Sequence, residues 1–181
     1  MQLKSIFFLA FTAAPFAFAS TLPEVLGGIS QLGARITVLE GRVTISIPVT
    51  GGTQQVMTIH GSAANVLNAI DSTVSLITQL EKPVPTDACN AMLNAFQVMV
   101  PGMKAGFQAA VAKKNILTGF GAGRGAAVLG LDLINLRKGA VNIEVAALSV
   151  LPSDCADRVT ALRVDITDAI DVAIAAYNST N

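Results

Sequence analysis

The sequence contains few of the side chains that perform enzyme chemistry. It has no Trp, one Tyr, one His (His60) and two Cys. A single His with no marked nucleophile or orienting acid does not indicate a catalytic triad. One His and two Cys also provide too few ligands for an ordinary zinc site. We therefore predict a protein that is not an enzyme and needs no cofactor or metal ion, and we interpret His60 as a loop or surface residue just before a helix.

An excess of charge of either sign is also missing. Twelve basic residues balance twelve acidic ones, so the formal net charge is zero. Such a balance provides no electrostatic footprint for nucleic acid or anionic lipid. Beyond the first twenty residues, charges, Gly or Asn interrupt every apolar stretch, whereas a membrane span needs about 20 apolar residues. We expect no nucleic-acid partner and no transmembrane segment.

The N-terminus has the pattern of a secretory signal peptide. Lys4 provides a positive charge, residues 6–18 are apolar, and Ala17-Phe18-Ala19 matches the small-x-small pattern of a cleavage site. The apolar run contains Pro15 and is too short to span a bilayer. We predict a signal peptide over 1–19, one domain over 20–181, and a secreted product that is extracellular or in the cell wall.

The two cysteines, Cys89 and Cys155, form an even pair, which in a secreted chain predicts one disulfide. The alternative is a Cys nucleophile, for which His60 is the sole His that could serve as a base. The lone glycosylation sequon begins at Asn178. Its place at the very C-terminus argues against its use.

Apolar residues recur at spacings of three and four along most of the chain, which indicates amphipathic helices. Residues 45–55 are interpreted as an extended connection, and the Gly-rich residues 119–125 as a break between helices. Five helices are expected, over residues 23–43, 61–80, 86–107, 125–149 and 152–177.

The third expected helix has a stripe of Met and Phe side chains on one face. Thr86 or Asp87 is the expected N-cap, and Pro101 is expected to kink the helix without ending it. Met side chains adapt to ligands of varied shape, so a cavity lined by this stripe would suit an acyl chain. A filled core would use the same residues, and the stripe alone favours that reading. The stripe comprises Cys89, Met92, Phe96, Met99, Met103 and Phe107.

The fourth expected helix is apolar on two opposite faces. One face contains Leu131, Ile134, Val141, Val145 and Leu148, and the other contains Leu129, Leu133, Leu136, Ala140, Ile143 and Ala147. Such a helix is either packed between two layers or packed on one side with the other side offered to a partner.

Cys89 and Cys155 each begin the apolar stripe of a helix, the third and the fifth. A disulfide between them places the starts of those helices side by side, so the two helices run parallel. Odd-numbered helices are parallel in an up-and-down bundle. The predicted fold class is therefore all-α, an up-and-down bundle of about five helices with one disulfide.

Two weaker patterns are given structural interpretations. Residues 121–126 match a loose G-x-G-x-x-A string, but the expected flanking elements are helices and a dinucleotide fingerprint requires a strand before it. The paired Asp residues of the last helix fall away from its apolar stripe, which indicates a solvated face and not a hydrolase pair.

The order of these features over residues 20–178 resembles the fungal hydrophobic surface-binding proteins and the related cell-wall galactomannoproteins. The resemblance includes the linker Lys82-Pro83-Val84-Pro85 and the closing helix Ala169–Tyr177. It implies a helical bundle that binds fatty acids in an apolar cavity, or that coats hydrophobic solids so that hydrolases can reach them. It carries over no catalytic residues.

We therefore expect a binding protein for a fatty acid or other lipid. The alternative is a surface-active adhesion protein whose partner is a hydrophobic surface or a cell-wall polymer; an enzyme or enzyme inhibitor is the third possibility. The predicted cavity wall, inferred from the stripes, comprises Met92, Phe96, Met99, Met103 and Phe107, with Leu131 and Ile134 or Leu162 and Ile166 opposite.

Overall fold

The computed structural model describes residues 19–44, 52–118 and 124–178. Within these ranges the chain forms five long α-helices, one short α-helix and one 3-10 turn, and its single disulfide joins Cys89 to Cys155. The elements are α1 (Leu22–Thr44), α2 (Gly52–Thr78), α3 (Thr86–Ala112), α4 (Lys114–Thr118), α5 (Arg124–Val150), η1 (Ser153–Cys155) and α6 (Ala156–Asn178). The all-α prediction and the disulfide are confirmed.

A capping box starts α1. The Thr21 backbone N–H donates to Glu24 Oε2 at 2.7 Å, and the Glu24 N–H faces Thr21 Oγ1 at 3.4 Å. This reciprocal arrangement satisfies N–H groups that have no partner within the helix. The hydrogen bond from the Thr21 backbone, followed by that from its side chain, lowers the pKa of the Glu24 carboxyl.

The start of α2 differs from the prediction. The helix begins at Gly52, where an extended connection to residue 55 was expected, so the predicted start near residue 61 is wrong. Residues Thr53, Gln54 and Gln55 are polar and indicate a loop when read alone. Gly52, Val56 and Ile59 are buried, and this packing stabilises the additional turns. His60 therefore lies within a helix and not before one.

Helix α3 runs through Pro101 without ending, as expected. Its start differs in detail, because the residue at the N-cap position is Pro85 and no side chain caps the helix. The short helix α4 was not expected, and its Leu117 is almost fully buried. Residues 119–123 of the Gly-rich segment, residues 45–51 and residues 1–18 of the predicted signal peptide lie outside the described residues.

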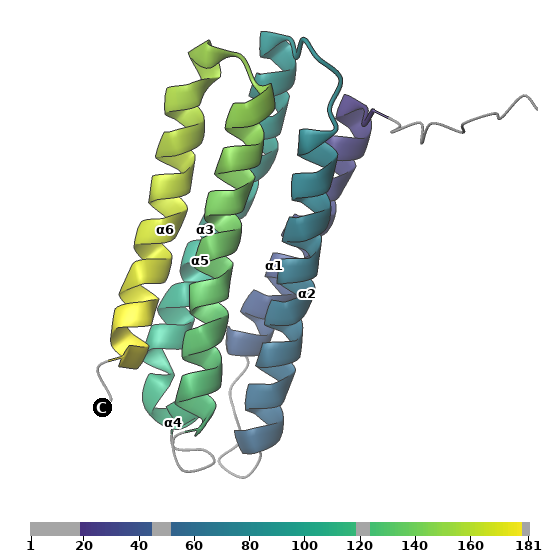
Figure 1. Ribbon diagram of the computed structural model, residues 1–181. Coiled ribbons are helices and arrows are strands. Elements are labelled where there is room, and N and C mark those ends of the chain that lie inside the picture. Colours follow the sequence, from purple (N-terminus) through teal and green to yellow (C-terminus); the bar gives the residue numbers. More distant parts are fainter. Residues whose placement is uncertain (1–18, 45–51, 119–123, 179–181) are drawn as a thin grey trace, which may run out of the picture.

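The five long helices form a ring whose order differs from their order in the chain. Helix α1 packs against α2 and α3, α2 against α5, α5 against α6, and α6 against α3. Figure 1 shows that helix direction alternates along the chain, so α3 and α6 are parallel as the cysteines predicted. Helix α1 lies between α2 and α3, and α6 lies between α3 and α5.

The α3–α6 seam is fixed near both ends. The Cys89–Cys155 disulfide joins the starts of the two helices, with Leu93, Ala147 and Val159 packed in a small apolar cluster around it. Near the other end, the Tyr177 hydroxyl donates to the Ala110 carbonyl oxygen at 3.1 Å. Most of the other buried apolar residues form one large core inside the ring. Among the described residues, no helix is long and apolar enough to cross a membrane.

Candidate functional site: an apolar cavity inside the helix ring

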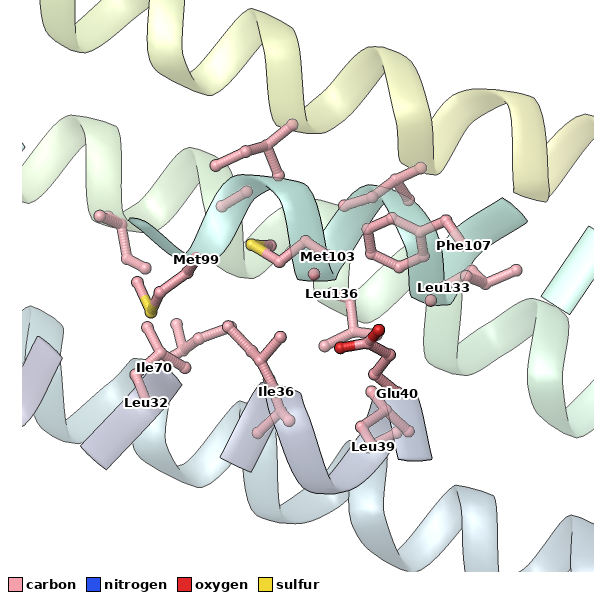
Figure 2. A pocket seen from close by; sticks show the side chains of 18 of the residues that line it. Leu32, Ile36, Leu39, Glu40, Ile70, Met99, Met103, Phe107, Leu133 and Leu136 are labelled. Carbon is pink, nitrogen blue, oxygen red and sulfur yellow. The ribbon is translucent and has the colours of Figure 1, made fainter. Parts of the chain in front are cut away.

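A cavity of about 130 Å³ lies inside the ring. All five long helices and Leu117 of α4 contribute to its wall, which is almost entirely aliphatic, Met and Phe. Figure 2 shows Leu32 and Ile36 of α1 and Ile70 of α2 opposite Met99, Met103 and Phe107 of α3. A wall of this composition offers a ligand apolar burial and few hydrogen bonds.

Glycines let the helices approach closely beside the cavity. Met99 Sδ lies 2.8 Å from where a Cβ on Gly33 would stand, and Ile70 Cδ1 lies 2.7 Å from the same position on Gly139. Any larger residue at Gly33 or Gly139 would meet these side chains. The absence of a side chain at Gly33 and at Gly139 thus leaves the space that Met99 and Ile70 occupy.

Seven of the nine predicted wall residues line this cavity. They are Met92, Phe96, Met99, Met103, Phe107, Leu162 and Ile166. Leu131 and Ile134 do not, so their prediction as wall residues is corrected. The Leu131 side chain faces outward and is 57% exposed.

The two apolar faces of α5 explain that error. The face that contains Leu129, Leu133 and Leu136 lines the cavity, while Leu131, Val145 and Leu148 on the opposite face are exposed. A helical wheel shows that two such faces exist but does not show which one is inside. Of the two interpretations of this helix, packing on one side with the other side exposed is correct.

The sequence prediction left the α1 and α2 walls out of the site. Their residues belong to the amphipathic stripes of those helices, so periodicity gave a signal for burial but none for a cavity. They are Leu32, Ile36, Leu39, Val43, Ile59, Ala63, Val66 and Ile70.

Four charged residues also reach the cavity wall: Glu40, Asp132, Glu144 and Arg163. Glu40 lies on α1 among apolar side chains (Figure 2). Its Oε2 is 3.1 Å from where a Cβ on Gly102 would stand, so the carboxylate packs against bare α3 backbone. Glu40 follows Ile36 by four residues and precedes Val43 by three. Its place on the apolar stripe was the signal that could have found it.

Glu144 and Arg163 form an ion pair between α5 and α6. Arg163 Nε donates to Glu144 Oε2 at 2.9 Å, and the Glu144 side chain is 11% exposed. The pair satisfies a nearly buried carboxylate, which would otherwise be costly to desolvate. Arg163 is the one cation among these four residues, and its guanidinium is already paired with the Glu144 carboxylate.

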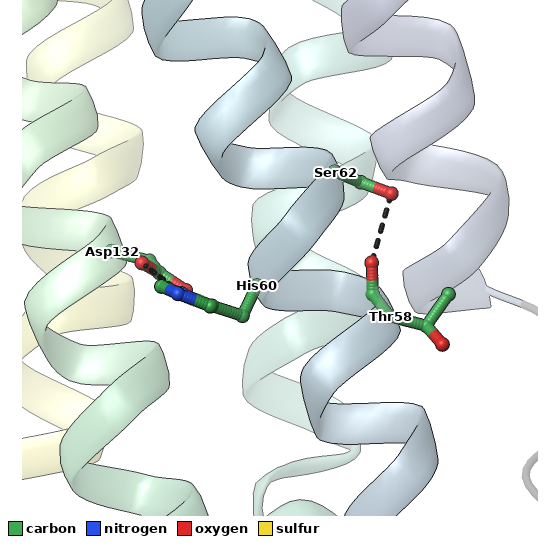
Figure 3. Close-up of polar contacts among 4 residues, drawn as sticks. All are labelled: Thr58, His60, Ser62 and Asp132. Atoms are coloured by element: carbon green, nitrogen blue, oxygen red, sulfur yellow. Dashed lines mark hydrogen bonds and ion pairs between the residues drawn. The ribbon is translucent and has the colours of Figure 1, made fainter.

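Asp132 is held by His60 across the α2–α5 contact (Figure 3). His60 Nδ1 lies 2.9 Å from Asp132 Oδ1 and 3.1 Å from Oδ2. Asp132 is 6% exposed, and desolvation raises the pKa of its carboxyl, while the hydrogen bond and the charge of His60 act in the opposite direction. The pair resembles two members of a triad. The nearby Ser62 hydroxyl, however, donates to the Thr58 carbonyl within its own helix at 3.0 Å.

The geometry does not assemble a metal site from the described residues. No three His, Cys, Asp or Glu side chains gather there, and both cysteines are in the disulfide. Asn178 is the exposed last residue of α6, and the rest of its sequon lies outside the described ranges. The arrangement that remains is an apolar cavity with four charged groups at its wall.

The fold places this chain among all-α proteins in which a ring of five helices surrounds an apolar cavity. A scan of protein-family models finds no match, and a search of curated proteins finds none either. Solved structures do match. AfMP4p in complex with palmitic acid superposes with a TM-score of 0.78 at 18% identity, over 86% of this chain and 99% of that one.

Two ligand-binding domains of the Penicillium marneffei MP1 protein share the fold as well. Domain 1, complexed with arachidonic acids, matches with a TM-score of 0.73 at 14% identity, over 83% of this chain and 94% of that one. Domain 2, complexed with multiple arachidonic acids, matches with a TM-score of 0.75 at 16% identity, over 85% and 94%. The helical-bundle prediction is thereby confirmed by experimental structures of similar chains.

Proposed function

We propose that this protein is a non-enzymatic binder of a long-chain fatty acid or a similar acyl lipid, held in the central cavity. The observation that carries the proposal is the wall itself, to which every helix of the ring contributes apolar side chains. The fatty acids in the solved structures that share the fold support it. Each methylene buried from water would contribute about 0.8 kcal/mol.

Uptake of an acyl chain must widen the cavity. Its volume of about 130 Å³ is below the roughly 300–1,000 Å³ of ordinary ligand pockets. Met99 and Met103 have unbranched side chains with several rotatable bonds, so they can move at low cost. We expect the ligand to displace these two side chains from their present positions at the cavity wall.

The test is native mass spectrometry and calorimetry on the delipidated protein with palmitic and arachidonic acid. Saturable binding to the wild type is expected. Met103→Trp fills the cavity and should weaken binding at least tenfold, whereas Met57→Trp, at a residue 55% exposed, should bind as the wild type does. Absence of saturable binding to folded wild-type protein would refute the proposed function.

The exposed face of α5 favours a second candidate, a surface-active adhesion protein. Leu131, Val145 and Leu148 present aliphatic side chains to solvent on one side of that helix. A hydrophobic solid or a cell-wall polymer would be the partner. Replacing all three by Gln should reduce adsorption to wax or polyester particles without changing fatty-acid binding. Equal adsorption of the two proteins would contradict this candidate.

We further propose that residues 1–19 direct secretion to the extracellular space or cell wall, and that the chain is a distant member of the fungal family that its sequence resembles. The disulfide is typical of an oxidising compartment. The Ser20 backbone N–H already donates to the Gln79 carbonyl oxygen at 2.8 Å, so a chain beginning at Ser20 keeps that contact. N-terminal sequencing of the secreted protein tests the cleavage site, and a start other than Ser20 would contradict it.

A further inference from the structure

The outer side of the α3–α6 seam has a groove that meets the central cavity at one residue. The groove has a volume of about 650 Å³, and Pro101 and Lys104 of α3 face Arg158 and Asp165 of α6 across it. Leu162 lines both the groove and the cavity. Leu162 is thus the residue at which the lining of the groove meets the lining of the apolar cavity.

The charged side chains that line the cavity are mostly acidic, whereas those that line the groove are mostly basic. Three carboxylates, Glu40, Asp132 and Glu144, and one guanidinium, Arg163, line the cavity. Two cations, Lys104 and Arg158, and one carboxylate, Asp165, line the groove. An anionic head group is therefore repelled from the cavity and attracted to the groove, because like charges at low dielectric are costly.

One cation of the groove, Lys104, is held by a weak contact. Lys104 Nζ lies 2.5 Å from Asp165 Oδ1, and the two side chains are 39% and 50% exposed. Exposed pairs of this kind contribute about 0–1 kcal/mol, so another carboxylate can replace Asp165 at little cost. Arg158, by contrast, donates to Asn90 Oδ1 at 2.6 Å. Lys104 is the cation of the groove that already holds a carboxylate, which the carboxylate of a ligand can replace.

The seam is also most free to widen at this point. The disulfide at Cys89 and the Ala110–Tyr177 hydrogen bond hold its two ends, and on α3 these are about 32 Å apart at 1.5 Å per residue. Pro101 lies between them and removes the N–H that the Gln97 carbonyl would accept in a regular helix. Between these ends the Lys104–Asp165 ion pair also joins the two helices, but it is an exposed contact of small energy, so we expect the seam to widen most easily there.

We propose that the α3–α6 groove is the entrance to the cavity and that Lys104 holds the carboxylate of the ligand there, with the acyl chain passing Leu162 into the ring. This inference rests on the proposed function and adds the orientation of the ligand. It assigns the head group to the outside of the bundle and the methyl end to the cavity.

Charge variants of the full chain test the head-group site, with palmitate and hexadecanol as probes. Lys104→Glu should weaken palmitate binding about tenfold and leave hexadecanol binding within twofold of wild type. Asp165→Asn frees Lys104 and should strengthen palmitate binding, a gain that misfolding cannot mimic. Lys138→Glu is a matched change on the exposed side of α5, and it should change the affinity for neither palmitate nor hexadecanol. Equal palmitate affinity for Lys104→Glu and wild type would overturn the head-group assignment.

Leu162 variants test the path, with stopped-flow rates as the readout. Leu162→Ala should speed both association and dissociation of palmitate, and Leu162→Trp should slow both. Val172→Trp, at a residue 65% exposed on α6, is the control. Unchanged rates in both Leu162 variants would refute the entrance. If the wild type binds neither probe, the proposed function itself fails, and the groove assignment fails with it.

Discussion

His60 Nδ1 and Asp132 Oδ1 are 2.9 Å apart and join α2 to α5 beside the cavity. His60 is partly exposed and can bind water instead, whereas Asp132 is buried. Asp132 therefore needs the hydrogen bond more than His60 does. The imidazole satisfies a carboxylate that the fold has removed from water. The pair is therefore a structural support of the cavity wall, and its loss should be felt mainly through Asp132.

We predict that His60→Ala destabilises the protein by about 1–3 kcal/mol at pH 7, because the buried carboxylate loses its partner. The further change Asp132→Asn should recover much of that loss, since the amide has no charge to desolvate. Urea denaturation of the single and double variants measures both effects. A double variant as unstable as His60→Ala would contradict the assigned role of Asp132.

The same variant should show a defined pH dependence. Burial raises the pKa of Asp132 above its ordinary value, and His60 opposes that rise, so removing His60 raises this pKa further. A raised carboxyl pKa in the folded state gives stability that is present at low pH and lost as pH rises through the folded-state pKa. The stability deficit of His60→Ala should therefore shrink as pH falls from 7 toward 4. A deficit that grows on acidification would contradict this sign.

Tyr177 should limit stability in alkali. Burial raises the pKa of its hydroxyl from 10.0 to about 12. The folded state thus keeps a proton that the unfolded chain releases, so this contribution is complete below pH 10 and is lost as pH rises toward 12. Tyr177→Phe should lose about 1 kcal/mol at neutral pH, when the Ala110 carbonyl loses its donor. Its unfolding free energy should then fall less steeply than that of the wild type between pH 10 and 12. Chemical denaturation of both proteins over the same pH series measures this, and because Lys titration is common to both, only the difference between them is compared.

The disulfide should provide a large share of stability. It joins residues 66 apart in the sequence, and a closed loop of that size contributes about 4 kcal/mol in the chain-entropy model. Replacing both Cys89 and Cys155 by Ala should lower the unfolding free energy by roughly 2–5 kcal/mol. Chemical denaturation under non-reducing conditions measures this. A loss below about 1 kcal/mol would show that the packing around the bond carries the α3–α6 contact alone.

Two neighbouring leucines should respond differently to the same change. Leu133→Gln places an amide in the cavity wall and should cost about 2–4 kcal/mol and weaken acyl-ligand binding. Leu131→Gln lies on the outer face and should stay within about 0.5 kcal/mol of wild type with unchanged ligand affinity. Thermal melts with and without palmitate compare the two. If both substitutions changed the palmitate-induced shift in melting temperature equally, the ligand would not bind inside the ring.

The sequence alone determined that five long helices form, the disulfide and the parallel course of α3 and α6, but not the short helix α4. The helices follow from amphipathic stripes that recur every 3.6 residues, and the disulfide from an even pair of cysteines in a chain with a predicted signal peptide. The start of α2 was missed because Thr53, Gln54 and Gln55 carry no apolar period of their own. Only burial of Gly52 and Val56 against neighbouring helices extends the helix over them.

The tertiary structure decided the rest of the site. The order of helices in the ring selects which face of α5 is inside, so Leu133 lines the cavity and Leu131 does not. It also places Glu40 and Arg163 at the cavity wall and Leu162 at the wall of both the cavity and the groove. Periodicity reports that a residue is buried but not which helix it faces. That choice depends on how five helices close into a ring, which is set by contacts between residues far apart in the sequence.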